Sequence, residues 1–509
     1  MLDIKKVYNK IEQIVGAEYL TDKDFMKAAY SRNVDPAFPD RWPDLIIRPG
    51  STEEVSEIVK IANKYKIKMV PRGGGADLVG GATTEEGLLI DLTRMNNILE
   101  INEKDFYCVV ECGVTWGELI SDLYKKGLTT GVLGPGSGYS ATIGGALSNS
   151  TAGFGSTKYG LVPDNCLGVE VVLPNEEGTI IKTGAASNKY AEPICRYGES
   201  PDFTGLFMGD AGTLGIKTKA YLRLYPNSPY KVQRNYMLKK DDYDIVFKLM
   251  HKLQRKVREA IHDLYVNPRV VVQVLAGQAE RKPDRRVRIR APVFMFILEA
   301  FDKRILDVYI EQVDEIMGPY SRPFEWHEID LDEPLEEDWK LTLKFPYSYF
   351  NKFIALAPPK ISCTTCHKLP ISKMQEKKNL SEEFDQTHRP EFPKDSFSLF
   401  ARSIHLLPNG HCVFAGGFNA ENADEEREQA MKIWHKKVRS QVRYGGVHYW
   451  LGESISQSIV EADAYSPEFI TFFKDIKKTV DPHFLLSPNK FHMHSYEDDI
   501  TKYIKRDEE

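Results

Sequence analysis

Glycine is concentrated in three stretches of the first half of the chain, at residues 70–81 (VPRGGGADLVGG), 131–160 and 208–215. Glycine lets the backbone adopt positive φ angles and lets a ligand come within hydrogen-bonding distance of main-chain N–H groups. Successive N–H groups in such a loop form a concave nest that binds anions. Three stretches so close in the chain therefore indicate several backbone contacts with one extended ligand that contains a diphosphate.

The first glycine stretch matches neither of the two common phosphate-binding motifs. A dinucleotide fingerprint requires G-x-G-x-x-G, but the third glycine position after Gly73 and Gly75 is Leu78. A P-loop requires a lysine after its second glycine, but Gly80 is followed by Gly81. For this stretch alone, a turn without a ligand is an equal alternative. The two companion stretches favour the bound ligand.

A second set of side chains that could do chemistry lies between residues 402 and 449. The set comprises Arg402, His405, His448 and Tyr449, with His411 as a further candidate. Histidine is the side chain that most often moves a proton in an enzyme. Arginine binds carboxylates through paired hydrogen bonds. These residues are therefore candidates for catalysis on a small anionic substrate, although each histidine taken alone can also be a hydrogen-bonded structural residue.

Two further segments carry a functional and a structural interpretation. CTTCH, residues 363–367, matches the C-x-x-C-H pattern of c-type haem attachment, but no signal peptide for export precedes it. Plain thiols are the main interpretation there, with haem or a metal or cluster contact as alternatives. The basic segment ERKPDRRVRIR, residues 280–290, is either a solvated loop and strand or a docking surface for an acidic electron-transfer protein.

Hydrophobic spacing indicates the elements that must position these groups. Residues 45–75 are typical of a strand, a helix capped by Ser51 or Thr52, and a second strand that enters the first glycine loop. Between residues 86 and 113, short apolar runs alternate with turns, which is typical of short strands in a small mixed sheet. A later section predicts strands at 230–238, 269–276 and 287–301 and helices at 242–257 and 302–317, hence a sheet covered on one face by helices. A hairpin around residues 408–410 and helices at 426–442 and 466–481 follow.

Length and composition narrow the class of protein. A chain of 509 residues is expected to form two or three domains. A formal charge of −6 argues against nucleic-acid binding. Seven cysteines are too few and too scattered for a disulfide framework, and the apolar runs are about half the length of a membrane span. The N-terminus has helical spacing and no signal peptide. We therefore predict a cytoplasmic protein without a membrane span.

Three segments together carry a resemblance to a known family. The segments PDLIIRPGSTEEVSEIVKIANKYKIKMVPRGGGADLVGG, GPGSGYSATIGGALSNSTAGFGSTKYGLVPDNCLGVEVVLPN and MGDAGTLGIKTKAYLRLYP occur in this order within residues 43–226. They resemble the FAD-binding domain of the vanillyl-alcohol oxidase and p-cresol methylhydroxylase (PCMH) superfamily, which includes D-lactate and glycolate dehydrogenases. The terminal DPHFLLSPNKF is similar to that superfamily's C-terminal signature, with Asn489 where glycine is usual.

The resemblance implies a fold and a set of FAD contacts. The implied fold is α+β, with a two-subdomain PCMH-type FAD-binding domain and a cap domain built on an antiparallel sheet. We expect these domains at residues 1–227 and 228–450, and a C-terminal segment at 451–509 that returns to the FAD domain. The implied cofactor-binding residues are Arg72, Gly73, Gly74, Gly75, Ala76 and Asp77 at the diphosphate, Pro135, Gly136, Ser137, Thr142, Gly144, Gly145 and Ser148 along the ribityl chain and flavin, Gly153, Tyr159 and Gly160 nearby, Val171, Gly215 and Ile216 at the nucleotide end, and Lys490.

Two departures from the family pattern bear on the chemistry. Some relatives link the flavin covalently to a histidine just after the glycine run; Ala76 stands at that position, so only attachment from the cap stays open. In the 2-hydroxy-acid branch, two cap histidines around a glycine turn hold a metal. In HLLPNGH, His405 and His411 are one residue closer and the acidic turn residue is missing. We therefore predict no metal site.

The resemblance implies an FAD-dependent oxidoreductase that transfers a hydride to the flavin from a 2-hydroxy acid or a related alcohol. One alternative is oxidation of a 4-alkylphenol or aromatic alcohol through a quinone methide, in which cap tyrosines such as those of PYSYF, residues 346–350, would hold the phenolate. A second alternative is an electron-relaying subunit of an iron–sulfur complex. The expected partners are a small-molecule substrate and an electron-transfer protein, and the chain is expected to form a homo-oligomer or to be a complex subunit.

Overall fold

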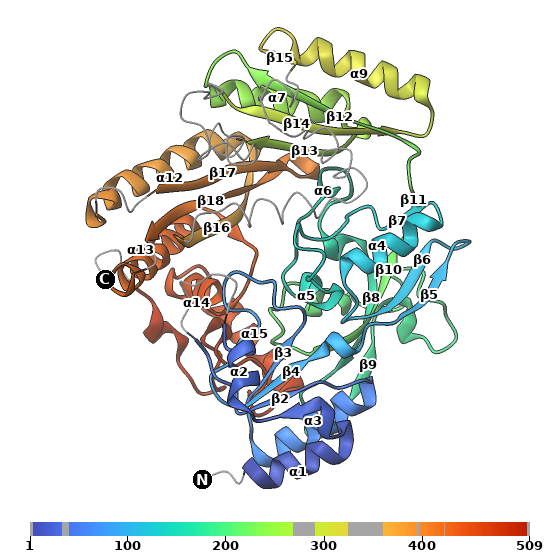
Figure 1. The fold of residues 1–509 in the computed structure, drawn as a ribbon, viewed down its shortest axis with the longest axis vertical. Coiled ribbons are helices and arrows are strands. Elements are labelled where there is room, and N and C mark those ends of the chain that lie inside the picture. Colours follow the sequence, from blue (N-terminus) through green and yellow to red (C-terminus); the bar gives the residue numbers. More distant parts are fainter. Residues whose placement is uncertain are drawn as a thin grey trace.

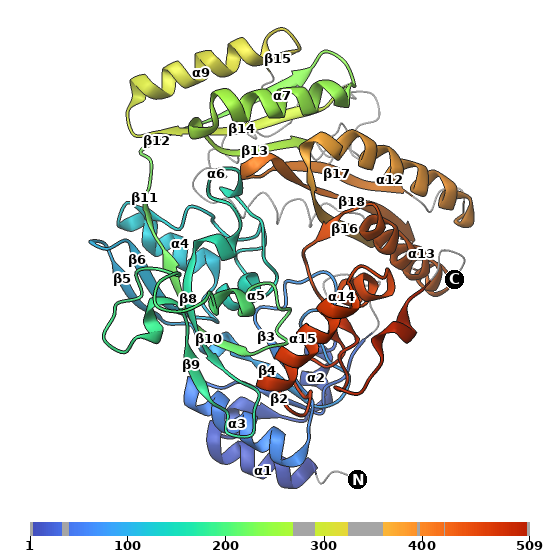
Figure 2. The same cartoon turned by 180° about the vertical axis from the view of Figure 1, so that it is seen from behind.

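The computed structural model describes residues 4–32, 40–267, 291–323, 360–393, 398–421 and 423–505. The N-terminal half and the C-terminal segment together form one body, the lower one in Figure 1, and the middle of the chain forms a large sheet above it. The chain passes from one to the other between β11 (Tyr225–Pro226) and β12 (Tyr230–Leu238). Figure 2 shows the same two bodies from behind, with α6 (Ser156–Tyr159) of the lower body beside β13 (Ile261–Asn267) of the upper one.

The first sheet of the lower body is built from the predicted β-α-β unit. Its strand order is β1-β2-β4-β3, and β2, β4 and β3 are parallel. Ser51 caps α3 by accepting a hydrogen bond from the N–H of Glu54 at 3.1 Å. The elements are α1 (Ile4–Val15), β1 (Leu20–Thr21), α2 (Asp24–Tyr30), β2 (Leu45–Ile47), α3 (Thr52–Tyr65), β3 (Met69–Arg72) and β4 (Leu88–Asp91). Apolar side chains of α1 and α3 cover one face of the sheet, and β3 ends where the first glycine loop begins.

The second sheet of the lower body is antiparallel and holds the other glycine loops. Its strand order is β5-β6-β10-β8-β9. The elements are β5 (Ile98–Asn102), β6 (Tyr107–Glu111), α4 (Trp116–Lys125), β7 (Leu128–Thr129), α5 (Ile143–Ser148), α6 (Ser156–Tyr159), β8 (Cys166–Val172), β9 (Ile180–Lys182) and β10 (Ile216–Arg223). Helices α4 and α5 pack on this sheet in one apolar cluster. The two sheets form the two subdomains of the lower body.

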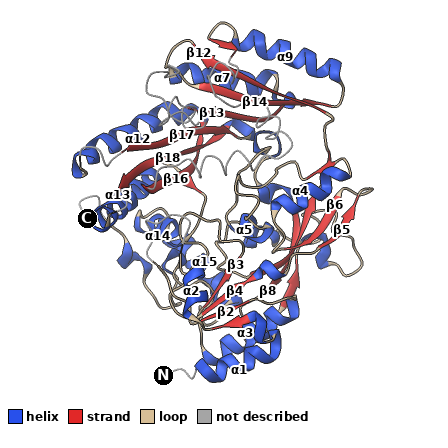
Figure 3. Ribbon diagram, viewed as in Figure 1, coloured by secondary structure: helices blue, strands red, loops and turns tan. Residues whose placement is uncertain are grey.

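The upper body, here called the cap, is one antiparallel sheet of eight strands in the order β15-β12-β14-β13-β17-β18-β16-β19. Its further elements are α7 (Tyr243–Lys256), β13 (Ile261–Asn267), β14 (Val293–Ala300), α9 (Lys303–Met317), β15 (Ser321–Pro323), β16 (Lys360–Pro370), α12 (Met374–His388), β17 (Ser398–Leu406), β18 (His411–Glu421), α13 (Asp424–Arg443) and β19 (Val447–His448). Figure 3 shows α7, α9 and α12 on the side of the sheet that faces away from the lower body, and α13 packs against β16 and β18. The sheet meets the lower body where Thr157 contacts Asp263 of β13.

The C-terminal segment returns to the lower body. It contains α14 (Glu453–Glu461) and α15 (Pro467–Val480), followed by a strand-like stretch beside β3. The N–H of Met69 donates to the carbonyl of Leu485 at 2.8 Å, and the N–H of Ser487 donates to the carbonyl of Met69 at 2.8 Å. The C-terminal residues therefore pair with the strand that leads into the first glycine loop.

The predicted helices of the cap and its strand at 230–238 are present, but the strands between residues 261 and 301 differ from the prediction. Ile261–Asn267 forms a strand that the apolar pattern does not indicate, because His262 and Asp263 interrupt the pattern although both are buried. The strand predicted at 269–276 lies outside the described residues, as does the start of the one predicted at 287–301, of which Val293–Ala300 forms β14. Across the described ranges, no helix has both the length and the apolar character that a bilayer crossing needs.

Candidate functional site

The first two glycine stretches pack directly against each other. A Cβ atom on Gly74 would lie 1.7 Å from the carbonyl oxygen of Ser140, and one on Gly73 would lie 2.1 Å from Oγ1 of Thr142. Gly75 has a φ of +66°, a backbone angle that residues other than glycine rarely adopt. Since no Cβ fits at these contacts, the glycines are needed for the two loops to form one continuous surface.

Arg72 and Asp77 shape the first loop from within. Asp77 accepts hydrogen bonds from the N–H groups of Val79, at 3.3 Å, and Gly81. Arg72 donates to the carbonyl of Ala82 at 3.0 Å. Burial raises the pKa of Asp77, and its backbone donors and Lys490 oppose this effect. The Asp77 carboxylate thus organises its own loop.

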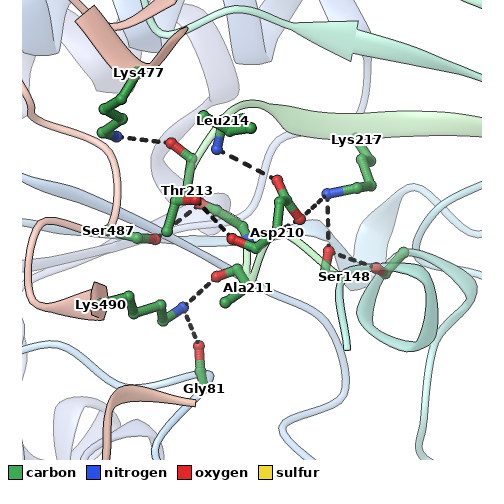
Figure 4. Close-up of polar contacts among 12 residues, drawn as sticks. Gly81, Ser148, Asp210, Ala211, Thr213, Leu214, Lys217, Lys477, Ser487 and Lys490 are labelled. Atoms are coloured by element: carbon green, nitrogen blue, oxygen red, sulfur yellow. Dashed lines mark hydrogen bonds and ion pairs between the residues drawn. The ribbon is translucent and has the colours of Figure 1, made fainter. Parts of the chain in front are cut away.

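The third glycine loop, residues 208–215, is held by lysines and a serine of the C-terminal segment (Figure 4). Lys477 donates to the carbonyl of Thr213 at 2.7 Å and forms an ion pair with Asp481 at 2.7 Å. Lys490 donates to the carbonyls of Ala211, at 2.7 Å, and of Gly81, at 2.9 Å. The C-terminal segment therefore joins the third glycine loop to the first.

Lys217 links the third loop to the second (Figure 4). Its ammonium forms an ion pair with Asp210 at 2.7 Å and a hydrogen bond with Oγ of Ser148 at 3.0 Å. Ser148 in turn donates to the carbonyl of Gly144 at 2.9 Å. Lys217 and Asp210 have side chains 3% and 1% exposed. All three glycine loops are thus fixed to one another by buried polar contacts.

Most of the remaining residues predicted to contact the cofactor lie along the same loops. A Cβ on Gly153 would lie 1.7 Å from the carbonyl oxygen of Gly134, so this segment lies against the one that begins at Pro135. A Cβ on Gly215 would lie 2.3 Å from Cγ1 of Val171 on the neighbouring strand. Gly136 and Ser137 lie in the turn that precedes α5, and the carbonyl of Ser137 accepts from the N–H groups of Ser140 and Ala141. Gly145 lies within α5, Gly160, with a φ of +80°, follows α6, and Ile216 starts β10.

Tyr159 instead points to the cap. Its hydroxyl donates to Oε1 of Glu299 at 3.2 Å. Glu299 also forms ion pairs with Lys158, at 2.8 Å, and with Lys231, at 3.2 Å. His262 lies edge-on to the Tyr159 ring, with centroids 5.9 Å apart. Helix α6 of the lower body is therefore tied to strands β12, β13 and β14 of the cap by a buried polar cluster.

His405 lies on the cap face that meets the lower body. Its Nε2 is 2.6 Å from Oδ1 of Asp263, and the ring of Tyr265 stacks on its own with centroids 4.0 Å apart. Oγ1 of Thr157, on helix α6, is 3.0 Å from the same carboxylate oxygen. Phe154 contacts Tyr265 with ring centroids 5.9 Å apart. The structure therefore brings this candidate together with the second glycine stretch.

His448 and Tyr449 follow each other in sequence but face opposite sides of the sheet. Tyr449 belongs to an apolar cluster with Cys366 and with Ala152 of the lower body. His448 is the register partner of His367, and the two rings have centroids 5.2 Å apart on the side that α13 covers. Burial lowers the pKa of His448 to about 3. Tyr449 thus lies near the interface with the lower body, and His448 is not brought together with His405.

The other candidates of the cap are placed as follows. Arg402 lies within β17, and its side chain is outside the described part of the structure. His411 starts β18 and is half-buried, and burial together with Lys368 lowers its pKa. The basic segment 280–290 and PYSYF, 346–350, also lie outside the described residues.

The CTTCH segment forms part of β16. Cys363 and Cys366 are 2% and 1% exposed and are three residues apart on the strand, so their side chains point to opposite faces. One haem cannot bond both sulfur atoms in this arrangement, and neither thiol reaches the surface to meet a partner. The geometry favours plain buried thiols, the main interpretation of this segment.

The sequence pattern does not indicate that several residues belong to the site. Asp263 lies in a strand that the apolar pattern does not predict, and Thr157 is one of many small polar residues in its loop. Lys217, directly after the third glycine loop, and Lys477, in an amphipathic helix, have the spacing of ordinary surface lysines. Only their burial, 3% and 0% exposed, identifies them as part of the site.

Comparisons with known proteins agree with this geometry. Residues 43–184 match the model of a family described as an FAD binding domain. Glycolate oxidase subunit GlcD of Bacillus subtilis is 37% identical over 228 residues, which cover 45% of this chain and 46% of that protein. The mitochondrial D-lactate dehydrogenase (cytochrome) of Arabidopsis thaliana is 26% identical over 458 residues, which cover 88% of this chain and 73% of that protein.

A solved structure of p-cresol methylhydroxylase with bound substrate superposes on the chain with a TM-score of 0.80 at 17% identity, and the match covers 97% of this chain and 98% of that one. The match to the Bacillus protein, in contrast, spans about half of that protein, 46% of its length. The likeness to the solved structure concerns the fold, which is the PCMH-type α+β fold that the sequence predicts.

Residues 43–184 form an FAD-binding domain, and FAD is the cofactor. The described residues fit this group. Residues 73–75 are three successive glycines after β3, and Gly75 has a φ of +66°, which is the kind of backbone that forms a nest for a diphosphate. Lys490 supplies buried positive charge next to the same loop, because burial lowers its pKa only to about 8. A diphosphate would thus meet main-chain donors together with one cation.

Proposed function

We propose that this FAD-binding protein with the PCMH-type fold is a dehydrogenase that transfers a hydride from a 2-hydroxy acid, or a related alcohol, to the flavin. One observation carries the proposal. His405 lies on the cap face that meets the second glycine stretch, and a buried carboxylate, Asp263, is 2.6 Å from one nitrogen of its ring. Oxidation of a C–H bond next to a hydroxyl needs a base for the hydroxyl proton, and this imidazole is a suitable one.

In this reaction the lower body binds the cofactor, and the cap supplies the base. FAD, when bound, supplies the acceptor for the hydride. The glycine loops hold the cofactor from the lower body, and Lys490 adds positive charge beside them. His405 takes the hydroxyl proton from the cap side, with Tyr265 stacked on its ring to fix the ring plane. Tyr449 and Cys366 close the neighbouring part of the interface with apolar contacts that exclude water.

The names of the sequence relatives support this substrate class over the phenol alternative. The two relatives described above are named for glycolate and D-lactate, both 2-hydroxy acids. The solved structure named for p-cresol is 17% identical and supports the fold alone. An electron-accepting partner and an oligomeric assembly remain part of the proposal, since the Bacillus relative is named a subunit.

Anaerobic reduction of the flavin tests the proposal. The purified holoenzyme is mixed without oxygen with D- and L-lactate, glycolate, 2-hydroxyglutarate and 4-cresol, and the flavin absorption is followed. We expect one of the 2-hydroxy acids to bleach the flavin within seconds. Bleaching by 4-cresol alone would establish the phenol alternative. Bleaching by none of them, together with copurifying iron–sulfur chains, would establish the electron-relay alternative.

A further inference from the structure

We propose that Asp263 is a positioning residue that orients His405 toward the substrate. The hydrogen bond from Nε2 to Asp263 leaves the accepting lone pair of the imidazole on Nδ1, and Thr157 of the FAD-binding domain fixes the carboxylate in place. The inference rests on the proposed role of His405 as the base. It adds a residue that pattern reasoning on the sequence does not find, and it makes the geometry of the base depend on contact between the cap and the FAD-binding domain.

The arrangement follows from the register of the cap sheet. His405 on β17 is the register partner of Tyr265 on β13, and Asp263 is two residues before Tyr265 on the same face. Diagonal neighbours of this kind are within reach of each other across an antiparallel pair. Nε2 of His405 is accordingly 2.6 Å from Oδ1 of Asp263. The stacked ring of Tyr265 keeps the imidazole in the plane that this hydrogen bond requires.

Thr157 fixes the carboxylate from the other body. Its Oγ1 is 3.0 Å from Oδ1 of Asp263 and 2.7 Å from the carbonyl oxygen of Leu406, so its one proton can serve either acceptor. The same oxygen accepts a hydrogen bond from the N–H of Leu264 at 3.0 Å. Thr157 is 3% exposed and lies on α6, between the glycines of the second stretch. Separation of cap and FAD-binding domain would therefore release Asp263 as well.

Burial explains why Asp263 determines which nitrogen of His405 carries the proton. The residue is 0% exposed, and among the described residues its Oδ2 has no hydrogen-bond partner. A buried carboxylate is costly unless a charged or N–H donor compensates it. The Nε2–H of His405 is the donor at the shortest distance. Because Nε2 holds that proton in the neutral ring, Nδ1 carries the lone pair, and the substrate hydroxyl is expected on that side.

The first test needs no substrate. Nitrogen NMR of the holoenzyme, with labelled histidine, reports which ring nitrogen of each neutral imidazole is protonated, and the signal lost in His405→Gln belongs to this residue. We expect Nε2–H and a bare Nδ1 in the wild type. In Asp263→Asn the side-chain amide can donate to Nε2, and we expect the opposite tautomer. Asp314→Asn is the matched control. Asp314 lies on α9, away from His405, and its carboxylate accepts a hydrogen bond from the hydroxyl of Tyr236 on β12 at 2.6 Å.

The second test uses rapid mixing with the 2-hydroxy acid that reduces the flavin. We expect Asp263→Asn to lower the limiting rate constant of flavin reduction by about 10²-fold or more, with the dissociation constant of the substrate nearly unchanged. Thr157→Val leaves the Asp263–His405 contact but loosens it, and about a tenfold lower rate constant is expected. Asp314→Asn should retain the wild-type rate constant.

Three outcomes overturn the proposal: a wild-type His405 protonated on Nδ1, an unchanged tautomer in Asp263→Asn, or an unchanged rate constant in that variant. Should Asp263→Asn fail to fold, the wild-type tautomer and the rate constant of Thr157→Val decide. Failure of the proposed function is distinguishable, since it would appear as no flavin reduction by any 2-hydroxy acid in the wild type, whereas the tautomer is read without substrate.

Discussion

Lys490 bridges two glycine loops: its ammonium nitrogen lies 2.9 Å from the carbonyl oxygen of Gly81 and 2.7 Å from that of Ala211. Burial lowers the pKa of Lys490 to about 8, although Asp77 and Asp210 favour the charged form. A bound diphosphate adds negative charge near the first loop and stabilises the protonated form further. The cation is therefore present at neutral pH and is lost as the pH rises through about 8 in the protein without FAD.

FAD binding should consequently take up a proton at alkaline pH. Above the lowered pKa, the lysine must be recharged before it can attract the diphosphate, so we expect the affinity for FAD to fall by up to about tenfold per pH unit. Titration of apoprotein with FAD from about pH 7 to about pH 10 measures this. Lys490→Arg, which stays charged over the whole range, should bind FAD with much weaker pH dependence. Equal slopes in both proteins would contradict the role given to Lys490.

The contact between Gly74 and Ser140 gives a second prediction. A Cβ on Gly74 would lie 1.7 Å from a backbone oxygen, which cannot move as a flexible side chain can. We expect Gly74→Ala to bind little or no FAD and to lower the free energy of unfolding by at least about 2 kcal/mol. Urea unfolding and the flavin absorption of the purified protein measure both effects. Gly198→Ala, at an exposed position with nothing within 4 Å of the added Cβ, should keep full FAD content.

The FAD-binding domain was predictable from the sequence because its signals are local. A capped helix between two short strands, followed by glycines, is determined by neighbouring residues, and α3 is indeed capped by Ser51 at 3.1 Å from the N–H of Glu54. The glycine stretches likewise indicate backbone that must approach a ligand or another loop. Such features do not depend on which distant part of the chain packs against them.

The cap side of the site was predictable only in part, because its contacts join residues far apart in the sequence. His405 and Asp263 are 142 residues apart, and Thr157 is a further 106 residues before Asp263. Nothing in the spacing of either segment encodes that contact. Buried lysines such as Lys477, which is 264 residues from Thr213, are missed for the same reason. Pattern reasoning finds a helix face, but not the partner that neutralises a charge on it.

Lys477 gives a third prediction, on stability. Its ammonium is fully buried and contacts Asp481, Thr213 and Leu486, each at 2.7 Å. Lys477→Met removes the only cation that faces Asp481 in its described surroundings and leaves a buried carboxylate with main-chain donors alone, at 2.8 Å and 3.0 Å. Loss of the counter-ion of a buried charge typically costs about 3–5 kcal/mol. Urea unfolding of the apoprotein measures the loss. The double variant with Asp481→Asn should regain part of the lost stability, and a double variant no more stable than Lys477→Met would contradict the pairing.

The cluster around Glu299 gives the last prediction, on acid stability. Burial alone would raise the pKa of Glu299, but protonated His262, Lys231 and Lys158 outweigh it and lower that pKa to about 2. Burial also lowers the pKa of His262 to about 4, so at neutral pH only the two lysines face the carboxylate as cations. Its unfolded value is 4.5, so the carboxylate contributes stability above that pH and loses it as the pH falls through about 2. Glu299→Gln should therefore lower the free energy of unfolding by about 2–3 kcal/mol at neutral pH and by about 1 kcal/mol near pH 3.

Urea unfolding at both pH values measures the two differences between wild type and Glu299→Gln. The matched control is Glu259→Gln, since the Glu259 side chain is 71% exposed and should change stability little at either pH. Because Tyr159 donates to Glu299 at 3.2 Å, the same variant should also weaken the contact between α6 and the cap. Proteolysis between β11 and β12, the connection of the two bodies, should then be faster than in the wild type. A stability difference that stays constant from neutral pH to about pH 3 would show that the charge of Glu299 does not hold the cap in place.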